Sequence, residues 1–572
     1  MKSSDVAKVF QDVADLLELK GENPFKIRAY QKAARSIEHL PVEIEQLVAE
    51  KRLGEIPGVG EAITKKIDEL VATGRLEYYE KLKAEFPEGL STLLDIPGVG
   101  PKTAVLLSGE LGVSSADELE AAITGGKVAR LYRIGDKTAE NILHQIHAMR
   151  REDRRIPIGE ALPIVDEILL RLKYLPGVRN LSPAGSLRRF RETVGDIDLM
   201  ATADNAKDVI RSFTLLPQVK EVRASGTARA SVIVAGGLQV DLRIVEHDAF
   251  GSLLQYFTGS QQHNILLRER ARRKGLSLSE YGITNLDTQE LEKFDDEAAF
   301  YHRQDLQFIP PELREGQQEI ERAEQGTIPE LLEIADIKGD LHVHTNWSDG
   351  RDSIEDMALA ARDRGYQYLA ITDHSRGRGI AHGLDADRLE QQIAEIENLN
   401  QRISGIRILS GIEVDIRADG ILDLSPELLI KLDVVVASVH SAMNQPQEKM
   451  TRRILRAIEN PLVDVVAHPT CRLLPGREPV SVDMEVILQA AAKNKTALEI
   501  SAMPSRLDLK DIHIYRAREL GVKLVINTDA HSKRHLEFMR FGVGISRRGW
   551  CEAHDIMNTR PLDEFLSSLE AW

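Results

Sequence analysis

Cysteine is nearly absent from this chain. Among 572 residues only Cys471 and Cys551 are cysteines, and they lie far apart in the sequence. A disulfide scaffold needs several paired cysteines, and a cysteine zinc site needs them in closely spaced groups. The sequence therefore excludes both.

Long apolar runs and an excess of basic charge are also missing. The N-terminus lacks the apolar core of a signal peptide and no later run is long enough to span a bilayer, so we expect no membrane partner and a cytoplasmic location. The net charge of -16 excludes a uniformly basic surface for nucleic acid. Any such contact must be local, for example through the basic strips at residues 150–155 and 268–274.

The length predicts about three or four domains. Residues 1–150 have the apolar spacing of short amphipathic helices, and strand patterns begin near Ile156. After a polar run that ends near Pro329, strands and helices alternate, which predicts βα units around a parallel sheet or barrel.

A glycine motif is repeated in the helical region. IPGVG at residues 56–60 recurs at residues 96–100, each time before a helix, and a fainter copy begins at Arg133. One such turn is usually only a loop, but the repetition favours helix-hairpin-helix motifs, whose glycines and helix N-terminal amides bind a backbone phosphate of nucleic acid. The candidate DNA-binding residues are Gly58, Gly60, Gly98, Gly100, Lys102 and Thr103.

Basic and aromatic residues are interleaved in FKIRAYQKAAR, residues 25–35. This pattern fits a solvated helix face above packed aromatics as well as a contact with nucleic acid. Lys66, after the first hairpin, could attack an aldehyde to form a Schiff base, although most surface lysines have no such role.

Two aspartates alternate with apolar residues in GDIDLM, residues 195–200. On a strand Asp196 and Asp198 share one face. A bare Asp-x-Asp is more often a strand edge with solvated acids, but VDLR at residues 240–243 supplies a second strand with Asp241. If the two strands are neighbours in an antiparallel sheet, the three carboxylates could hold two metal ions of the Mg²⁺ type, and Asp241 could accept a hydroxyl proton.

The order GSLRR, GDIDLM, VDLR and YFTGSQQHN resembles DNA polymerase family X, which includes the small gap-filling repair polymerases, over about residues 1–315. The resemblance implies Mg²⁺ or Mn²⁺ at Asp196, Asp198 and Asp241, and gapped or nicked DNA and dNTPs as partners. It also implies that the incoming nucleotide and its base pair contact Gly185, Ser186, Arg189, Gly195, Tyr256, Phe257, Gly259, Asn264 and Arg268.

The same resemblance places Lys66 at the nucleophile of the family's 5′-deoxyribose-phosphate lyase, with Lys26, Tyr30 and Lys32 around it. Ala62 and Tyr78 stand where well-known members have lysines, so we expect at most a weak lyase activity. Gln239 replaces an arginine that neighbours the third aspartate.

Histidines and acids recur at the ends of the C-terminal strand-like segments. There are six such clusters, at residues 342–349, 372–374, 411–413, 438–440, 467–469 and 527–531. Because βα folds gather the strand ends on one face, these clusters predict a site for Zn²⁺ or Mn²⁺. The set resembles the polymerase and histidinol phosphatase (PHP) domain over residues 336–572, which implies a three-metal phosphoesterase centre. Its nine ligands are His342, His344, Asp349, His374, Glu413, His440, His468, Asp529 and His531.

These patterns and resemblances together predict six segments. They are a helix-hairpin-helix, lyase-like domain at 1–85, a second helix-hairpin-helix subdomain at 86–150, an α+β nucleotidyltransferase palm at 151–250, a subdomain for the nascent base pair at 251–315, a linker at 316–335, and a distorted TIM-like PHP barrel at 336–572. We expect a monomer that fills short gaps during DNA repair and processes 3′ ends, by exonuclease and by AP-endonuclease or 3′-phosphatase action.

Two other interpretations remain. In the first, nucleotidyl transfer is template-independent and the C-terminal domain is a small-molecule phosphatase; a template's effect on nucleotide choice distinguishes it. In the second, the chain is a non-catalytic scaffold for DNA ends, which the complete sets of acids and histidines disfavour.

Overall fold

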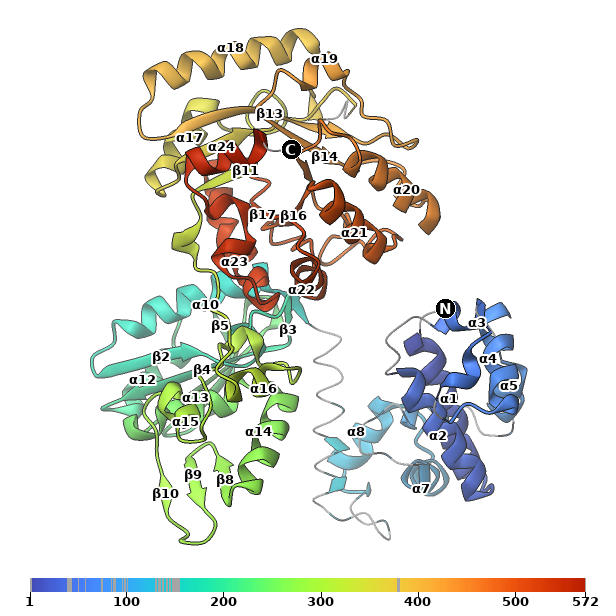
Figure 1. Ribbon diagram of the computed structural model, residues 1–572. Helices are drawn as coiled ribbons and strands as arrows, with labels where there is room; N and C mark the ends of the chain where they lie inside the picture. The colour runs from blue at the N-terminus through green and yellow to red at the C-terminus, as the bar shows by residue number, and fades with distance from the viewer. Residues whose placement is uncertain are drawn as a thin grey trace. The chain divides into compact units, whose positions relative to one another are not determined.

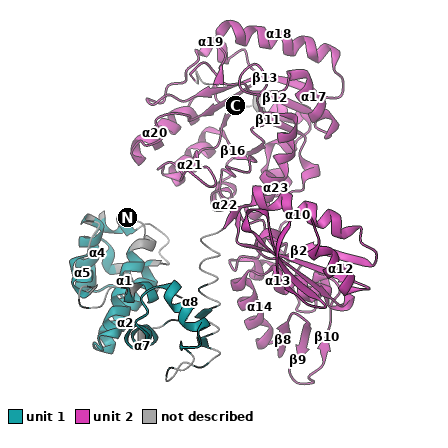
Figure 2. Ribbon diagram, turned by 180° about the vertical axis from the view of Figure 1, so that it is seen from behind, with its two compact units in different colours: residues 1–154 teal, residues 155–572 magenta. Residues whose placement is uncertain are grey.

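The computed structural model describes residues 155–377 and 381–570. Of the first 154 residues it describes all except 1–2, 39–43, 50, 57, 74–75, 84, 86–88, 95, 97–98, 100, 129–130, 132–134, 136–137, 140–141, 144–145 and 147–154. The chain forms two compact units, residues 1–154 and 155–572, which are described separately (Figure 2). No helix among the described residues is both long and apolar enough to cross a bilayer.

The first unit is helical, with two apolar cores. Its helices are α1 (Ser3–Leu19), α2 (Pro24–Glu38), α3 (Ile44–Ala49), η1 (Leu53–Glu55), α4 (Glu61–Thr73), α5 (Glu77–Lys83), α6 (Leu90–Leu94), α7 (Pro101–Leu111) and α8 (Ala116–Thr124). One core joins apolar residues between positions 6 and 82, and the other those between 93 and 146. α8 begins where Ser115 accepts a hydrogen bond from the Glu118 amide, as expected of an N-cap serine.

The second unit begins with a mixed sheet, here called the sheet region (residues 155–245). Its elements are β1 (Ile156–Pro157), α10 (Ile158–Lys173), β2 (Val178–Pro183), α11 (Gly185–Arg188), β3 (Thr193–Val194), β4 (Asp196–Ala203), α12 (Ala206–Thr214), β5 (Val219–Ser225), β6 (Arg229–Val234), η3 (Ala235–Gly237) and β7 (Gln239–Val245). The five-stranded sheet has the order β2-β4-β7-β6-β5.

The relative direction of β4 and β7 corrects one expectation. The two strands are neighbours, but they pair in parallel and not antiparallel. The reason is the path between them: α12 carries the chain across to β5, and the antiparallel pairs β5–β6 and β6–β7 then return it in the direction of β4.

The next part, here called the helical region (residues 246–336), packs around an apolar core to which Trp550 of the C-terminal part also contributes. It contains η4 (His247–Ala249), α13 (Phe250–Thr258), α14 (Gln261–Arg273), β8 (Leu276–Ser279), β9 (Gly282–Asn285), β10 (Leu291–Glu292), α15 (Glu297–His302), η5 (Pro311–Leu313), α16 (Glu319–Glu324) and η6 (Ile334–Asp336). Residues 316–335, expected to be a linker, include α16 and bury Ala323, Ile328 and Leu331 in this core together with Trp550. The segment is therefore packed and does not act as a free tether.

The C-terminal part, here called the barrel (residues 337–570), has seven parallel strands in sequence order (Figure 1). The strands are β11 (Gly339–Val343), β12 (Tyr368–Ile371), β13 (Arg407–Asp415), β14 (Val434–Ser438), β15 (Val465–Val466), β16 (Ala497–Ser501) and β17 (Leu524–Asn527). A parallel bridge between Val343 and Ala530 nearly closes the ring. This confirms the predicted βα barrel.

Helices and short helical turns connect and surround the barrel strands. They are α17 (Ile354–Asp363), α18 (Ala386–Arg402), α19 (Pro426–Leu429), α20 (Gln447–Ile458), α21 (Met484–Asn494), α22 (Asp511–Glu519), η8 (Lys533–Phe538), α23 (Met539–Arg548), η9 (Ala553–Asp555), η10 (Met557–Thr559) and α24 (Leu562–Glu570). Strands that are buried on both faces explain the continuous apolar runs, such as VVVAS at residues 434–438.

Two candidate catalytic centres

The first candidate centre lies on β4 and β7. Asp196 and Asp198 are half-buried on one face of β4, whereas Ile197 and Leu199 are buried on the other. Asp198 and Asp241 are directly opposite each other as Cα partners across the parallel pair. The sheet therefore brings all three predicted carboxylates to one face.

Asp241 has a local partner and borders a cavity. Gln239 Nε2 donates a hydrogen bond to Asp241 Oδ2 at 2.8 Å. A pocket of about 410 Å³ lies beside this face of the sheet, and its lining includes Gln239, Asp241 and Arg243 from β7 together with Arg229 and Ser231 from β6. The side chains around the third aspartate thus leave space for a ligand.

The predicted phosphate-binding residues lie directly before β4. Gly185 has φ +61°, and a Cβ atom there would lie 3.3 Å from Asp198 Oδ2, so glycine allows α11 to begin close to the carboxylate. Ser186 is in α11, and Gly195 immediately precedes Asp196. Arg189 is mostly buried: its Nε donates to Glu315 Oε1 at 3.2 Å and its Nη1 donates to the Thr258 carbonyl.

The predicted wall of the nucleotide site is in the helical region. Tyr256 and Phe257 lie in the last turn of α13, with their ring centroids 5.3 Å apart in an edge-to-face arrangement. The Arg243 guanidinium lies 4.5 Å from the Phe257 ring centroid. Gly259 adopts φ +67° between α13 and α14. On α14, Asn264 donates to the Tyr256 carbonyl at 2.8 Å, and Arg268 donates to the Asn264 carbonyl at 3.1 Å.

In the first unit the predicted lyase residues surround Tyr78. Tyr30 stacks on Tyr78 at 6.2 Å, and the Nζ atoms of Lys26 and Lys66 lie 5.7 and 5.0 Å from its ring centroid. Burial, the largest influence, raises the pKa of Tyr30 to about 12. Lys66 Nζ also donates to the Ala62 carbonyl at 3.3 Å.

The first glycine hairpin is partly described. Gly58 adopts φ +92°, and a Cβ atom there would clash with the Lys32 side chain at 2.8 Å. Gly60 precedes α4 and is exposed. Gly98, Gly100 and the Lys102 side chain lie outside the described residues, whereas Thr103 is half-buried in α7.

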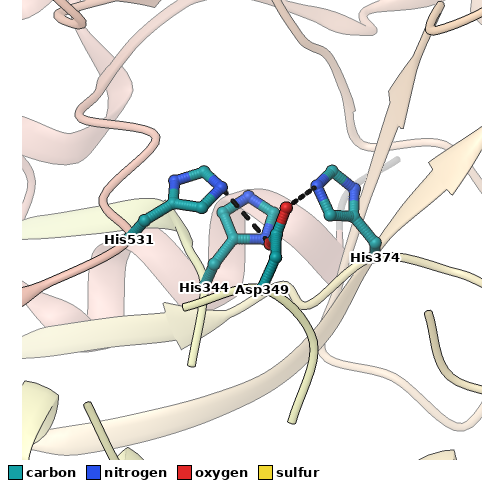
Figure 3. Close-up of side chains that lie close together, drawn as sticks. All are labelled: His344, Asp349, His374 and His531. Atoms are coloured by element: carbon teal, nitrogen blue, oxygen red, sulfur yellow. Dashed lines mark ion pairs between the residues drawn. The ribbon is translucent and has the colours of Figure 1, made fainter. Parts of the chain in front are cut away.

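The second candidate centre lies at the carboxyl ends of the barrel strands. Among the described residues, groups of three or more His, Cys, Asp or Glu side chains with ligand atoms within 4.8 Å of one another are found only in the barrel. The three aspartates of the sheet region do not form such a group. The barrel groups are His344, Asp349, His374 and His531 (Figure 3); His342, His344 and Asp529; and His374, Glu413 and His440.

Glu413 occupies the centre of this cluster. Its carboxylate oxygens lie 2.6 Å from His374 Nδ1, 3.2 Å from His440 Nε2 and 3.3 Å from His468 Nε2. His468 thus touches the cluster although it belongs to none of the three groups. Burial alone would raise the pKa of Glu413, but the surrounding histidines lower it well below its ordinary value.

The histidines differ in their protonation. Burial lowers the pKa of His344 to about 3 and that of His468 to about 4, which keeps both imidazoles neutral. For His374 burial acts in the same direction, but the Glu413 and Asp349 carboxylates raise the pKa to about 9. A metal ligand must be neutral, so a cation at His374 must displace a proton.

The donor set fits divalent metal ions. His342 Nε2, both ring nitrogens of His344 and both oxygens of Glu413 are buried, and among the described residues none of them forms a hydrogen bond of good geometry, although opposite charges lie close by. Buried polar atoms are normally hydrogen-bonded, so these converging atoms fit a site that could hold cations. Mixed imidazole and carboxylate ligands suit Zn²⁺ or Mn²⁺.

Several residues that support this cluster were not predicted. Glu499 Oε1 lies 2.7 Å from His342 Nδ1, Asp415 Oδ1 lies 3.3 Å from His440 Nδ1, and Arg506 Nε lies 3.5 Å from Asp529 Oδ2. Asp373 accepts hydrogen bonds from the amide and the hydroxyl of Thr345, and so shapes the loop after His344. A lone acid within the apolar strand ALEIS was the available signal for Glu499.

Four segments of the chain match known protein families. Residues 1–76 match the helix-hairpin-helix domain, residues 90–148 the SAM-like helix-hairpin-helix tandem, residues 253–315 the DNA polymerase beta thumb and residues 340–502 the PHP domain. The helix-hairpin-helix and PHP predictions are confirmed.

One known protein matches the whole chain, and others match about a third of it. The "DNA polymerase/3'-5' exonuclease PolX" of Bacillus subtilis (strain 168) is 41% identical over 572 residues, which covers 100% of both chains. A "Probable phosphatase" of Thermoanaerobacter sp. (strain X514) is 33% identical over 204 residues, 34% of this chain and 78% of that protein. One of Acetivibrio thermocellus is 30% identical over 201 residues. The full-length match and the four domains show that this chain belongs to the PolX family, the family X DNA polymerases with a C-terminal PHP domain.

Proposed function

We propose that this protein is a template-directed DNA polymerase that fills short gaps, and that its barrel is a metal-dependent 3′-5′ exonuclease. The observation that supports the proposal is that one chain brings together two groups of candidate ligands. Asp196, Asp198 and Asp241 lie on one sheet face, and nine histidines and acids lie at the carboxyl ends of the barrel strands, eight of them in the metal-compatible groups and His468 in contact with Glu413. The full-length relative is named for both activities.

At the first centre, Asp196, Asp198 and Asp241 would hold Mg²⁺ or Mn²⁺. Such ions would supply charge stabilisation for phosphoryl transfer. Asp241 is the acceptor for the proton of the primer 3′-hydroxyl, and Gln239 holds that carboxylate in place. Gly185, Ser186, Gly195 and Arg189 contact the triphosphate through amides, a hydroxyl and a guanidinium.

The helical region defines the rest of the nucleotide site. Tyr256, Phe257 and Gly259 form the wall beside the incoming sugar. Asn264 and Arg268 lie on α14, where they contact the nascent base pair and the template. The hydrogen bond from Asn264 to the Tyr256 carbonyl ties these two parts of the site together.

At the second centre, the nine barrel ligands would hold three ions, Zn²⁺ or Mn²⁺ or both. These ions would supply an activated nucleophile and Lewis acidity for phosphoester cleavage. Glu499 orients His342, and Arg506 adds positive charge beside Asp529 for a phosphate of the substrate. A DNA 3′ end is the substrate that suits a domain joined to a polymerase.

In the first unit we propose DNA contacts for Gly58, Gly60, Gly98, Gly100, Lys102, Thr103, Lys26, Tyr30 and Lys32. These residues bind backbone phosphates on the two sides of a gap and make no base-specific contacts. Lys66 is the nucleophile of a weak lyase activity at most. We expect the protein to act as a monomer.

A specific observation favours a second activity for the barrel. The relatives named as probable phosphatases share 30–33% identity over about a third of this chain. Hydrolysis of a 3′-phosphate, which blocks extension, is therefore a candidate activity beside exonuclease action. Phosphate release should be measured with two substrates in separate assays: DNA that ends in a 3′-phosphate, and a small phosphomonoester. The preferred substrate distinguishes a DNA-end phosphatase from a small-molecule phosphatase.

The decisive experiment uses a one-nucleotide gapped duplex with and without dNTPs. Asp196→Ala with Asp198→Ala should abolish extension and leave 3′ degradation. His342→Ala with His344→Ala should do the reverse. Extension by the aspartate variant would refute the first site, and loss of both activities in either variant would refute two separate centres.

A further inference from the structure

The loop that carries the proposed triphosphate contacts packs against the barrel. We name residues 184–195 the phosphate loop. A Cβ atom at Gly544 of α23 would lie 2.3 Å from the Phe190 ring, so the ring occupies the space left by that glycine. Glu192 Oε2 lies 2.9 Å from Arg472 Nη1. Figures 1 and 2 show α23 where the barrel meets the sheet region.

Arg548, the last residue of α23, joins three segments of the second unit. Its side chain is only 3% exposed. Its Nη1 donates to the Arg189 carbonyl at 2.7 Å and to Glu315 Oε1 at 2.8 Å. Its Nε and Nη2 donate to Asp511 Oδ2 at 2.9 and 2.6 Å. One buried guanidinium from the barrel thus holds the phosphate loop, the helical region and α22.

These contacts hold both the backbone and the side chain of Arg189 in place. Its carbonyl accepts from Arg548 directly, and its guanidinium is bound by Glu315, the same carboxylate that Arg548 contacts. The Arg189 side chain also donates to the Thr258 carbonyl, next to Gly259. The position of the Arg189 guanidinium therefore depends on a side chain that belongs to the barrel.

The charge arrangement favours one geometry. Burial alone would raise the pKa of Asp511, but the Arg548 guanidinium lowers it below its ordinary value, so the pair is ionised. The Arg548 guanidinium is planar and its N–H donors point outward along different edges, so Nε and Nη2 reach Asp511 while Nη1 reaches the Arg189 carbonyl. A lysine ammonium is a single point and cannot span these acceptors.

We propose that Arg548 is a positioning residue for nucleotide binding: it fixes Arg189 in the place from which its guanidinium meets the triphosphate. The proposal rests on the proposed function of the phosphate loop. The hydrogen bonds of Arg548 go to the Arg189 carbonyl, Glu315 and Asp511, and none of these acceptors is a proposed metal ligand. Its removal should therefore affect the binding of the incoming nucleotide more than the chemical step at either centre.

The test is steady-state filling of a one-nucleotide gap by the full-length protein. Arg548→Met should raise KM for the incoming dNTP by about tenfold, because a displaced binding group loses its alignment. The value of kcat, KM for gapped DNA and the exonuclease rate should change by less than about twofold. Arg548→Lys should restore KM only in part.

Arg547 offers a matched control. It precedes Arg548 on α23 and pairs with Glu312 and Glu333, which lie outside the phosphate loop. Arg547→Met should leave KM for dNTP unchanged. If Arg548→Met prevents folding, Asp511→Asn, which weakens the anchor of Arg548 and keeps its contact with Arg189, should raise KM in the same direction by a smaller factor.

Three results would overturn the proposal. They are an unchanged KM for dNTP in Arg548→Met, an equal loss of polymerase and exonuclease activity in that variant, and the same rise in KM in Arg547→Met. Arg189→Met separates this inference from the proposed function. If Arg189→Met leaves KM for dNTP unchanged, the triphosphate assignment fails; if Arg189→Met raises it and Arg548→Met does not, only the role of Arg548 fails.

Discussion

The Nδ1 atom of His342 lies 2.7 Å from Oε1 of Glu499, and both side chains are fully buried in the barrel. Glu499 also accepts hydrogen bonds from the His468 amide at 2.8 Å and from Asn527 Nδ2 at 3.0 Å. This carboxylate fixes the ring of His342 so that Nε2 faces Glu413 and Asp529. A carboxylate that holds a ligating histidine in this way fixes the orientation of the ring and raises its affinity for a metal ion.

Glu499→Gln should weaken metal binding at the barrel about 10- to 100-fold, because the amide orients His342 without the carboxylate charge. Titration of 3′ degradation with Mn²⁺ should show a higher metal requirement and recovery at excess metal, with gap filling unchanged. Glu485→Gln is the control, since Glu485 pairs with Arg516 at the surface. An unchanged metal requirement in Glu499→Gln would exclude this role.

The metal-free protein should lose stability as the pH rises from about 6.5 to 9. Burial opposes protonation of His374, but Glu413 and Asp349 raise its pKa to about 9 from the ordinary 6.5. Its protonated form therefore stabilises the fold fully below pH 6.5, and this contribution is lost through pH 9. Metal binding strengthens over the same range as the proton is displaced.

Thermal unfolding of chelator-treated and Mn²⁺-loaded protein measures this effect. The difference in Tm between the two forms should increase from pH 6.5 to 9. The same difference measured for His374→Gln should depend less on pH. A difference that narrows with rising pH in the unsubstituted protein would contradict the assignment of His374 as a ligand.

Gly185→Ala should impair polymerisation specifically. The substitution costs about 1 kcal/mol because Gly185 has positive φ, and its new Cβ would lie 3.3 Å from Asp198 Oδ2. We expect kcat for gap filling to fall by at least about tenfold and exonuclease activity to persist. Gly236→Ala separates strain from crowding, since Gly236 also has positive φ but no atom lies within 4 Å of the new Cβ. Equal losses in both variants would refute the crowding argument.

Glu297→Gln should destabilise the second unit. Glu297 is 6% exposed and its two oxygens each lie 2.6 Å from a guanidinium, of Arg188 and of Arg314. Removal of one charge from a buried ion-pair cluster typically costs about 3 kcal/mol, because the remaining charges stay desolvated. Urea unfolding should show the loss, whereas Glu448→Gln at the exposed pair with Arg452 should have little effect. A neutral result for Glu297→Gln would show that the cluster contributes nothing.

Tyr78→Lys should increase the lyase activity. Tyr78 lies under the ammonium groups of Lys66 and Lys26, at 5.0 and 5.7 Å, where a lysine would instead supply a further cation for a 5′-phosphate. The yield of the DNA Schiff base trapped by borohydride should rise several-fold, because the new lysine adds one charge-assisted contact to the 5′-phosphate. The rise should disappear in Tyr78→Lys combined with Lys66→Ala. Trapping that persists without Lys66 would exclude this lysine as the nucleophile.

Short-range patterns in the amino-acid sequence account for the local features of this protein. The period of two in GDIDLM places Asp196 and Asp198 on the same face of β4, and the βα alternation places the histidines at the carboxyl ends of the barrel strands. These features follow from residues close in the chain, and the same motifs carry the resemblance that the full-length match confirms.

The contacts between distant segments could be seen only in the folded chain. β4 and β7 are parallel because of the path through α12, β5 and β6, which no local pattern records. Residues 316–335 pack in the core of the helical region, Glu499 supports His342, and Arg548 holds Arg189 from more than three hundred positions away. Each of these contacts joins residues far apart in sequence, so its existence depends on the packing of whole elements and not on the spacing of residues within one.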